Sequence, residues 1–158
     1  SLLTRGTPTT PVGHRTWDTL TLEAGTPLFD TELVGRIPNV AGVRNGLDFE
    51  KGCYVGQEVV SRVENRGRPS KRLVGLELDA VPESGAAVFD GDASVGDVTR
   101  GAESPSLDRP IALAYVDSST LDADDFPLAV RVDGDAVDAT GTAHPLVDGS
   151  GRSVRCAR

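Results

Sequence analysis

The change in residue periodicity at Pro69 constrains the fold of this 158-residue chain more than any other feature. Beyond that proline, short apolar runs are separated by turns such as Asp90-Gly91-Asp92 and Asp133-Gly134-Asp135. Strand-length runs joined by Asp-Gly turns are typical of small antiparallel barrels and sandwiches. The runs cover residues 74–78, 87–89, 95–99, 111–116, 129–132 and 136–140. The pattern therefore predicts a compact antiparallel β-domain from residue 68 onward.

The segment before Pro69 predicts a mixed and less regular region. Trp17, Leu20 and Ala24 have helical spacing, and Gly25 with the following proline supplies a stop, which favours a helix over residues 16–24. The alternation of Leu20, Leu22 and Ala24 also permits a strand. Residues 25–50 are rich in turn signals. A second helix is predicted over residues 55–65, where valines recur on one face and Glu58 can pair with Arg62 four residues on.

The most informative stretch is the octapeptide Lys51-Gly52-Cys53-Tyr54-Val55-Gly56-Gln57-Glu58. Its two glycines allow a tight turn before the helix. A thiol near a helix N-terminus, with Lys51 close by, would be favoured as the thiolate. The alternative is that Cys53 is a small buried apolar residue, since free cysteine is among the most buried residue types.

The octapeptide resembles the signature of the YgfZ branch of the GcvT-like folate-binding proteins, relatives of the glycine cleavage T-protein, with Arg62 at the downstream Arg of that pattern. The segment Leu22-Glu23-Ala24-Gly25-Thr26-Pro27-Leu28 and the stretch Ile37-Pro38-Asn39 resemble further parts of the family pattern. Residues 95–101, 104–107 and 111–116 resemble its C-terminal barrel. Trp17 and Thr21 depart from the aminomethyltransferase pattern, which has Arg at both places.

This resemblance implies an α+β fold, in which a C-terminal antiparallel β-barrel follows the tail end of a mixed α/β folate-binding domain. Residues 1–67 would end the folate-binding domain and residues 68–158 would form the barrel domain. The chain begins at Ser1 and contains no Met, which predicts a fragment without the family's N-terminal part. The upstream acidic residue of true aminomethyltransferases would lie in that part.

The resemblance also implies tetrahydrofolate as the cofactor of the full-length protein. The first hypothesis is a YgfZ-type protein that supports assembly or repair of iron–sulfur enzymes, with iron–sulfur proteins as partners. The alternatives are an aminomethyltransferase, a folate-dependent transferase of the glycine cleavage system, and a non-enzymatic folate-binding or interaction module. The candidate catalytic residue is Cys53. The candidate folate-binding residues are Lys51, Tyr54, Gln57, Glu58, Arg62 and Glu23.

The charge balance limits the partners. Twenty-four acidic and 16 basic residues give a net charge of −8, which disfavours general nucleic-acid binding and binding to anionic membranes. The Asp-rich, Lys-poor composition favours a halophilic protein, with a GC-rich genome as the alternative explanation. The basic cluster Arg62, Arg66, Arg68, Lys71 and Arg72 either steers an anionic ligand or offsets the acidic surface.

No metal site is predicted, because His14 and His144 lack ligand spacing with the two cysteines, Cys53 and Cys156. Two cysteines so far apart do not form a disulfide framework. No signal peptide or membrane-length apolar run is present in the sequence, so a reducing cytoplasm is expected.

Overall fold

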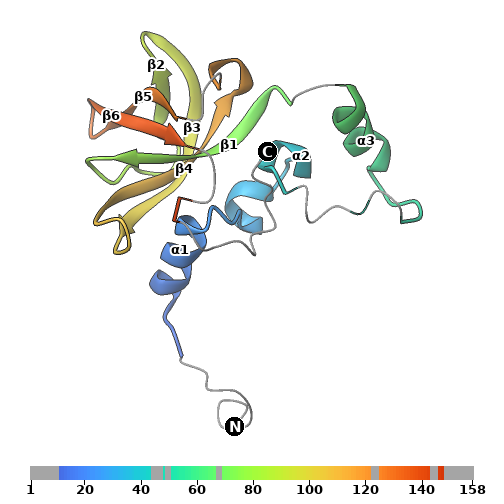
Figure 1. The fold of residues 1–158 in the computed structure, drawn as a ribbon, viewed down its shortest axis with the longest axis horizontal. Coiled ribbons are helices and arrows are strands. Elements are labelled where there is room, and N and C mark those ends of the chain that lie inside the picture. Colours follow the sequence, from blue (N-terminus) through green and yellow to red (C-terminus); the bar gives the residue numbers. More distant parts are fainter. Residues whose placement is uncertain are drawn as a thin grey trace.

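The computed structural model describes residues 11–43, 48, 51–66, 69–121, 125–142 and 146–147. The predictions for His144, Cys156 and the side chains of Arg66 and Arg68 lie outside these residues. Six antiparallel strands close into a barrel in the order β1-β4-β3-β2-β5-β6 (Figure 1). Their bounds are β1 Lys71–Leu78, β2 Ala87–Asp90, β3 Ala93–Ser104, β4 Arg109–Asp117, β5 Asp125–Val132 and β6 Asp135–Thr142. The predicted antiparallel barrel and the α+β class are therefore confirmed.

All six predicted runs fall within these strands, but the strands extend further at one or both ends. The largest difference is β3, which continues to Ser104 instead of ending near residue 99. Its register against β4 shifts between Val98 and Arg100, and the strand stays paired beyond that point. An irregularity of this kind breaks strict alternation, so periodicity alone ends the strand too early.

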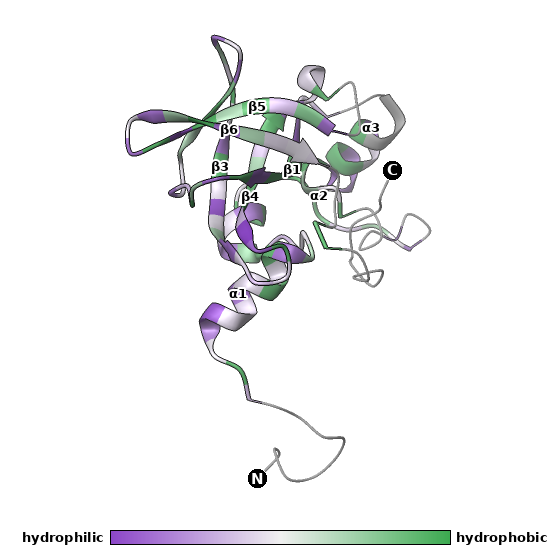
Figure 2. Ribbon diagram, turned by 60° about the vertical axis from the view of Figure 1, so that its left-hand side comes forward, coloured by the Kyte–Doolittle hydropathy of each residue, from purple (hydrophilic) through white to green (hydrophobic). Residues whose placement is uncertain are grey.

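Hairpin geometry follows from the turn residues. Asp133 and Gly134 have φ values of 52° and 96°, which are the two positive values that a tight hairpin turn of the I′ type requires. They join β5 to β6, whose pairing runs from Val132 opposite Asp135 to Asp125 opposite Thr142. Figure 2 shows hydrophobic residues along the strands and hydrophilic residues at the hairpin ends.

Strand β4 is buried on both faces, which explains its uninterrupted apolar sequence. Ala112, Ala114 and Val116 belong to the cluster of residues in the barrel interior. Ile111, Leu113 and Tyr115 belong to a second cluster that includes Leu22 of helix α1. Because side chains alternate between faces of a strand, the small residues point inward and the large ones point toward the helix.

Helix α1 (His14–Glu23) confirms the helical reading of this segment over the strand alternative. It ends as the sequence predicts, with Gly25 at φ 61° just beyond it. The buried residues of α1 are Thr21, Leu22 and Glu23, whereas Trp17 and Leu20 are exposed. The helix therefore turns its last-turn residues, two of them polar, toward the barrel, and Trp17 and Leu20 away from it.

The turn-rich segment contains two short helical elements. The π-helical turn η2 (Phe29–Leu33) is defined by the bond from Leu33 N to Leu28 O of 3.1 Å. Helix α2 (Pro38–Ala41) starts with proline in its first turn and ends at Gly42, where φ is 70°. A short 3₁₀ turn, η4 (Ser118–Thr120), follows β4.

Helix α3 (Gln57–Arg66) begins two residues later than predicted, because Gly56 takes a φ of 88°. Val55 thus precedes the helix and is exposed, Val59 is also exposed, and Val60 is buried. The side-chain amide of Asn39 donates to the carbonyl of Val60 at 3.3 Å, which links α3 to α2. In Figure 1, α3 projects away from the barrel.

Candidate functional site

The octapeptide forms an exposed loop that leads into α3. The side-chain oxygen of Gln57 accepts a hydrogen bond from the backbone N–H of Tyr54 at 3.4 Å, which closes the loop onto the start of the helix. Cys53 and Lys51 are exposed, and Tyr54 and Gln57 are half-buried. The thiol is thus presented at the surface on a turn before a helix, and the buried reading of Cys53 does not hold.

The charged side chains in and after this loop make contacts with residues close to them in the sequence. The ammonium of Lys51 lies 5.1 Å from the centroid of the Tyr54 ring, within the range of a cation–π contact. The Lys51 backbone N–H donates to the carboxylate of Asp48 at 3.2 Å. Glu58 and Arg62 form the predicted pair four residues apart, at 2.8 Å and largely exposed. The loop and first helical turns therefore bring six of the seven candidate residues together.

The seventh candidate, Glu23, lies apart from the loop, at the end of α1 against the barrel. Its carboxylate is buried and accepts hydrogen bonds from the Ser104 hydroxyl at 2.6 Å, the Ser106 hydroxyl at 3.0 Å and the Ser106 N–H at 3.3 Å. Its carbonyl also accepts from the N–H groups of Leu146 and Val147. Through these contacts, Glu23 holds the end of α1 against the β3–β4 hairpin.

A second buried carboxylate, Glu32, was not among the candidates. Its side chain is fully buried in η2 and forms an ion pair with Nε of Arg100 on β3 at 3.0 Å. It also accepts hydrogen bonds from the hydroxyls of Thr31 and Thr99 and from the N–H of Leu28. Sequence gives little sign of this group, because Glu32 and Arg100 are 68 residues apart in the chain and Glu32 belongs to no motif.

Arg100 also makes hydrogen bonds to helix α1 and to the turn that follows it. One terminal nitrogen donates to the Thr21 hydroxyl at 2.8 Å and to the carbonyl of Asp18, and the other donates to the carbonyl of Thr26 at 2.7 Å. The guanidinium group of Arg100 thus lies beside Thr21. Arg100 belongs to the barrel strand β3, and its hydrogen bonds to Glu32 and to α1 join that strand to the helical segment.

An open cleft of about 410 Å³ lies between η2 and the barrel. It is lined by Asp30, Thr31, Arg36, Ser84, Gly85, Asp97, Val98 and Thr99. The guanidinium carbon of Arg36 lies 3.9 Å from the centroid of the buried Tyr115 ring. The hydroxyl of Tyr115 in turn donates to the carbonyl of Glu32 at 2.8 Å. None of the sequence-predicted candidates lines this cleft.

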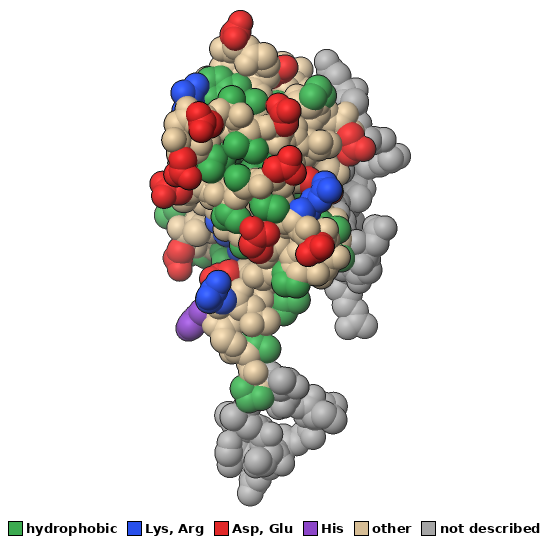
Figure 3. All heavy atoms as spheres, turned by 90° about the vertical axis from the view of Figure 1, so that its left-hand side faces the viewer, with side chains coloured by type: hydrophobic (Ala, Val, Ile, Leu, Met, Phe, Trp, Pro, Cys, Tyr) green, Lys and Arg blue, Asp and Glu red, His purple; other side chains and the backbone are tan. Residues whose placement is uncertain are grey.

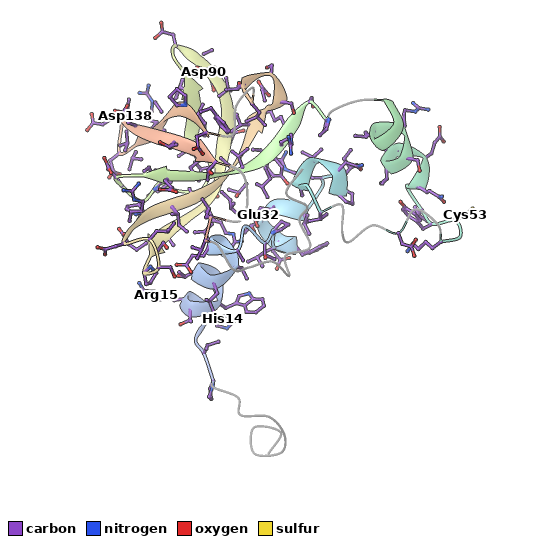
Figure 4. The ribbon with its side chains drawn as sticks, viewed as in Figure 1. His14, Arg15, Glu32, Cys53, Asp90 and Asp138 are labelled. Carbon is purple, nitrogen blue, oxygen red and sulfur yellow. The ribbon has the colours of Figure 1, made fainter. Side chains whose placement is uncertain are left out.

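Figure 4 shows the distribution of the charged and reactive groups. Cys53 lies on the loop below α3, and Glu32 lies beneath the barrel, so the thiol and the buried carboxylate are far apart in the molecule. Acidic side chains are spread over the barrel face seen in Figure 3, with few basic ones among them. In the described ranges, no three His, Cys, Asp or Glu residues gather as a metal site would require. No helix there is long and apolar enough to span a membrane.

Comparison with known proteins gives matches over most of the chain. Residues 71–148 match the glycine cleavage T-protein C-terminal barrel domain. The chain is 40% identical over 141 residues to an aminomethyltransferase of Streptomyces coelicolor. The aligned segment covers 85% of this chain and 36% of that protein. A probable aminomethyltransferase of Halobacterium salinarum is 39% identical over 146 residues, 87% of this chain and 39% of that protein.

Among solved structures, the glycine cleavage system aminomethyltransferase T of Bartonella henselae superposes with a TM-score of 0.77 at 26% identity. This match covers 93% of the present chain and 42% of the Bartonella chain. The chain therefore spans little more than a third of the length of the curated relatives, and the match extends through the helical segment as well as the barrel.

Proposed function

Because this chain belongs to the GcvT-like folate-binding protein family and represents its C-terminal portion, we propose that it serves in a tetrahydrofolate-dependent aminomethyltransferase. The observation that carries the proposal is the 40% identity to an aminomethyltransferase over 85% of the chain. The family resemblance implies the reaction: a one-carbon unit passes from an aminomethyl-lipoyl protein to tetrahydrofolate, and ammonia is released.

The proposal reverses the order of the two sequence-based hypotheses. The octapeptide favoured a YgfZ-type role in iron–sulfur enzyme maintenance. The curated relatives described above carry the name aminomethyltransferase or probable aminomethyltransferase, and nothing in them supports iron–sulfur proteins as partners. A single eight-residue motif is a narrower basis for assignment than identity spread over most of the chain.

The candidate residues suit part of a folate. Its glutamate tail carries carboxylates; Lys51 places a cationic group on the octapeptide loop, and Arg62, which is paired with Glu58, lies just after it. Tyr54 and Gln57 would border the ligand. However, Val55 between them is completely exposed, so the described residues form an open surface and not an enclosed pocket. Ligand sites usually bury most of their ligand, and we therefore infer that the remaining walls come from the N-terminal part of a full-length protein.

The test uses a full-length protein that contains this chain, supplied with tetrahydrofolate and an aminomethyl-lipoyl carrier protein. Ammonia release that depends on both components is the expected result. A matched measurement by calorimetry should give much weaker tetrahydrofolate binding to residues 1–158 than to the full-length protein. Full-length protein that binds tetrahydrofolate but releases no ammonia would overturn the assignment.

The YgfZ-type function remains a second candidate because the motif cysteine is exposed on its turn. The two candidates differ in their need for this thiol. Under the aminomethyltransferase proposal, Cys53→Ser leaves ammonia release unchanged. Under the YgfZ-type proposal, the same variant fails to restore iron–sulfur enzyme activity in a deletion strain.

We further propose residues 1–67 and 68–158 as the two structural units of the chain.

A further inference from the structure

The open cleft between η2 and the barrel has the size of a small-molecule site. Its volume of about 410 Å³ falls within the range in which proteins hold small ligands. Of the described residues that line it, Val98 alone has a wholly apolar side chain. The lining is otherwise polar and includes the hydroxyl groups of Thr31, Ser84 and Thr99. A ligand that suits this cleft is therefore small and polar.

Two unlike charges line the cleft without pairing with each other. They are the carboxylate of Asp30 and the guanidinium of Arg36. Among the described residues, neither group forms an ion pair or a side-chain hydrogen bond. The guanidinium carbon of Arg36 lies 3.9 Å from the centroid of the Tyr115 ring, and such stacking leaves the N–H groups of an arginine available. This pair of charges suits a ligand that carries both an ammonium and a carboxylate.

A third charged group of the lining, Asp97, already has a cationic neighbour. Its carboxylate lies 3.8 Å from the ammonium of Lys71, which also lies 3.9 Å from the carboxylate of Asp117. Asp30 and Asp97 together would repel a phosphate or another multiply charged anion. The same repulsion disfavours the glutamate tail of a folate, which has carboxylates but no ammonium. A zwitterion avoids this repulsion, because its ammonium can face the carboxylates.

The backbone that carries these charges is fixed to the barrel. Glu32, which is fully buried in the same turn as Asp30, accepts a hydrogen bond from the Thr99 hydroxyl at 2.8 Å. The carbonyl of Glu32 accepts a further hydrogen bond from the hydroxyl of Tyr115 at 2.8 Å. The ring of Tyr115 is the one against which Arg36 stacks. A cleft held in this way loses less conformational entropy when a ligand binds.

We propose that this cleft binds a small α-amino acid in its zwitterionic form. Arg36 takes the α-carboxylate through paired N–H donors, and Asp30 takes the α-ammonium. Ser84 adds a hydroxyl group to the lining. Because Val98 offers the cleft little apolar surface, it favours amino acids with small or hydroxyl-bearing side chains over those with large apolar ones. The inference rests on the cleft and does not depend on the proposed reaction.

The test is an NMR titration of residues 1–158 with each standard amino acid in turn. Saturable changes in the amide signals of Val98 and Thr99 are expected for an amino acid with a small or hydroxyl-bearing side chain. Its N-acetyl derivative lacks the ammonium and its carboxamide lacks the carboxylate, so each should bind roughly tenfold more weakly or worse. The proposal is overturned if no amino acid gives saturable changes, or if either derivative binds as tightly as its parent.

Variants with matched controls test the two charges separately. Arg36→Gln and Asp30→Asn should each weaken binding by roughly tenfold or more. Arg131→Gln is the control for the first, because Arg131 also stacks on an aromatic ring but does not line the cleft. Asp138→Asn is the control for the second, because Asp138 is exposed on β6 and outside the cleft. Circular dichroism should stay unchanged in every variant. Unaltered affinity in either cleft variant, or an equal loss in its control, would overturn the site.

Discussion

The Nε atom of Arg100 lies 3.0 Å from Oε1 of Glu32, and this contact ties the third barrel strand to a turn that precedes it by 68 residues. The Arg100 side chain is 13% exposed and the Glu32 side chain is fully buried. A buried pair of this kind is costly to break, because the surviving charge is left without its partner. The pair therefore sets how firmly the helical segment is held on the barrel.

The first prediction concerns the loss of one member of this pair. Arg100→Leu should lower the free energy of unfolding by about 3–5 kcal/mol, since it leaves the Glu32 carboxylate uncompensated. Arg62→Leu removes the exposed pair with Glu58 and should cost less than about 1 kcal/mol. Urea unfolding followed by circular dichroism measures both. Equal effects of the two substitutions would show that burial does not matter at Glu32.

A second prediction separates structure from ligand binding at Glu23. Its carboxylate is engaged by Ser104 and Ser106, so Glu23→Ala should leave these donors unpaired and cost about 1–3 kcal/mol. Lys51→Ala, in contrast, should leave stability unchanged and weaken tetrahydrofolate binding to the full-length protein. The readouts are urea unfolding and calorimetry. If the Glu23 variant kept normal stability but lost affinity for tetrahydrofolate, Glu23 would be a folate-binding residue and not a structural one.

The third prediction uses the close approach of β3 to β4. A Cβ atom on Gly96 would lie 2.0 Å from the carbonyl oxygen of Tyr115, so the paired strands would have to move apart. Gly96→Ala should destabilise the protein by about 1–3 kcal/mol, as overpacking does elsewhere. Gly52→Ala is the control, because nothing lies within 4 Å of its added carbon. Thermal unfolding that is the same for both variants would contradict the register described here.

The fourth prediction concerns the exposed thiol. Iodoacetamide should label Cys53 readily in the folded protein, because its side chain is exposed. Peptide mass spectrometry distinguishes this label from one on Cys156. Cys53→Ala should leave the urea midpoint unchanged. Strong protection of Cys53 in the folded state would disagree with its exposed position on the loop.

The fifth prediction concerns salt. With 24 acidic and 16 basic residues, the folded chain repels itself at low ionic strength, and added salt screens this repulsion. The melting temperature should therefore rise from low salt to molar potassium chloride. A flat or falling melting temperature would favour genome composition, and not halophily, as the origin of the acidic sequence.

The sequence predicts the strands of the barrel and the two longer helices, because alternation and helical spacing are local properties. Periodicity alone does not distinguish a closed barrel from a sandwich, because closure depends on Gly75 meeting Thr142 across most of the domain; the family resemblance is what implied the barrel. The sequence also leaves open why residues 111–116 are continuously apolar. The answer lies in α1, which covers the outer side of β4 through Leu22 and so buries Ile111, Leu113 and Tyr115.

For a similar reason, the sequence predicts the octapeptide part of the candidate site well and the role of Glu23 poorly. The octapeptide is one continuous segment, so its loop, its exposed thiol and the Glu58–Arg62 pair follow from neighbouring residues. Glu23 belongs to a recognisable motif, but its partners lie about 80 residues further along the chain. Motif matching marks such a residue as important without saying whether it binds a ligand or holds the fold together.

The pairing of the first barrel strand with the last has a consequence for synthesis on the ribosome. Residues 75–78 of β1 find their partners in residues 139–142 of β6, so one side of β1 stays unpaired until nearly the whole domain has emerged. An open strand edge is a template for association with other chains. Nascent chains that stall between β4 and β6 should therefore be the aggregation-prone species, and those that have released residue 142 should not.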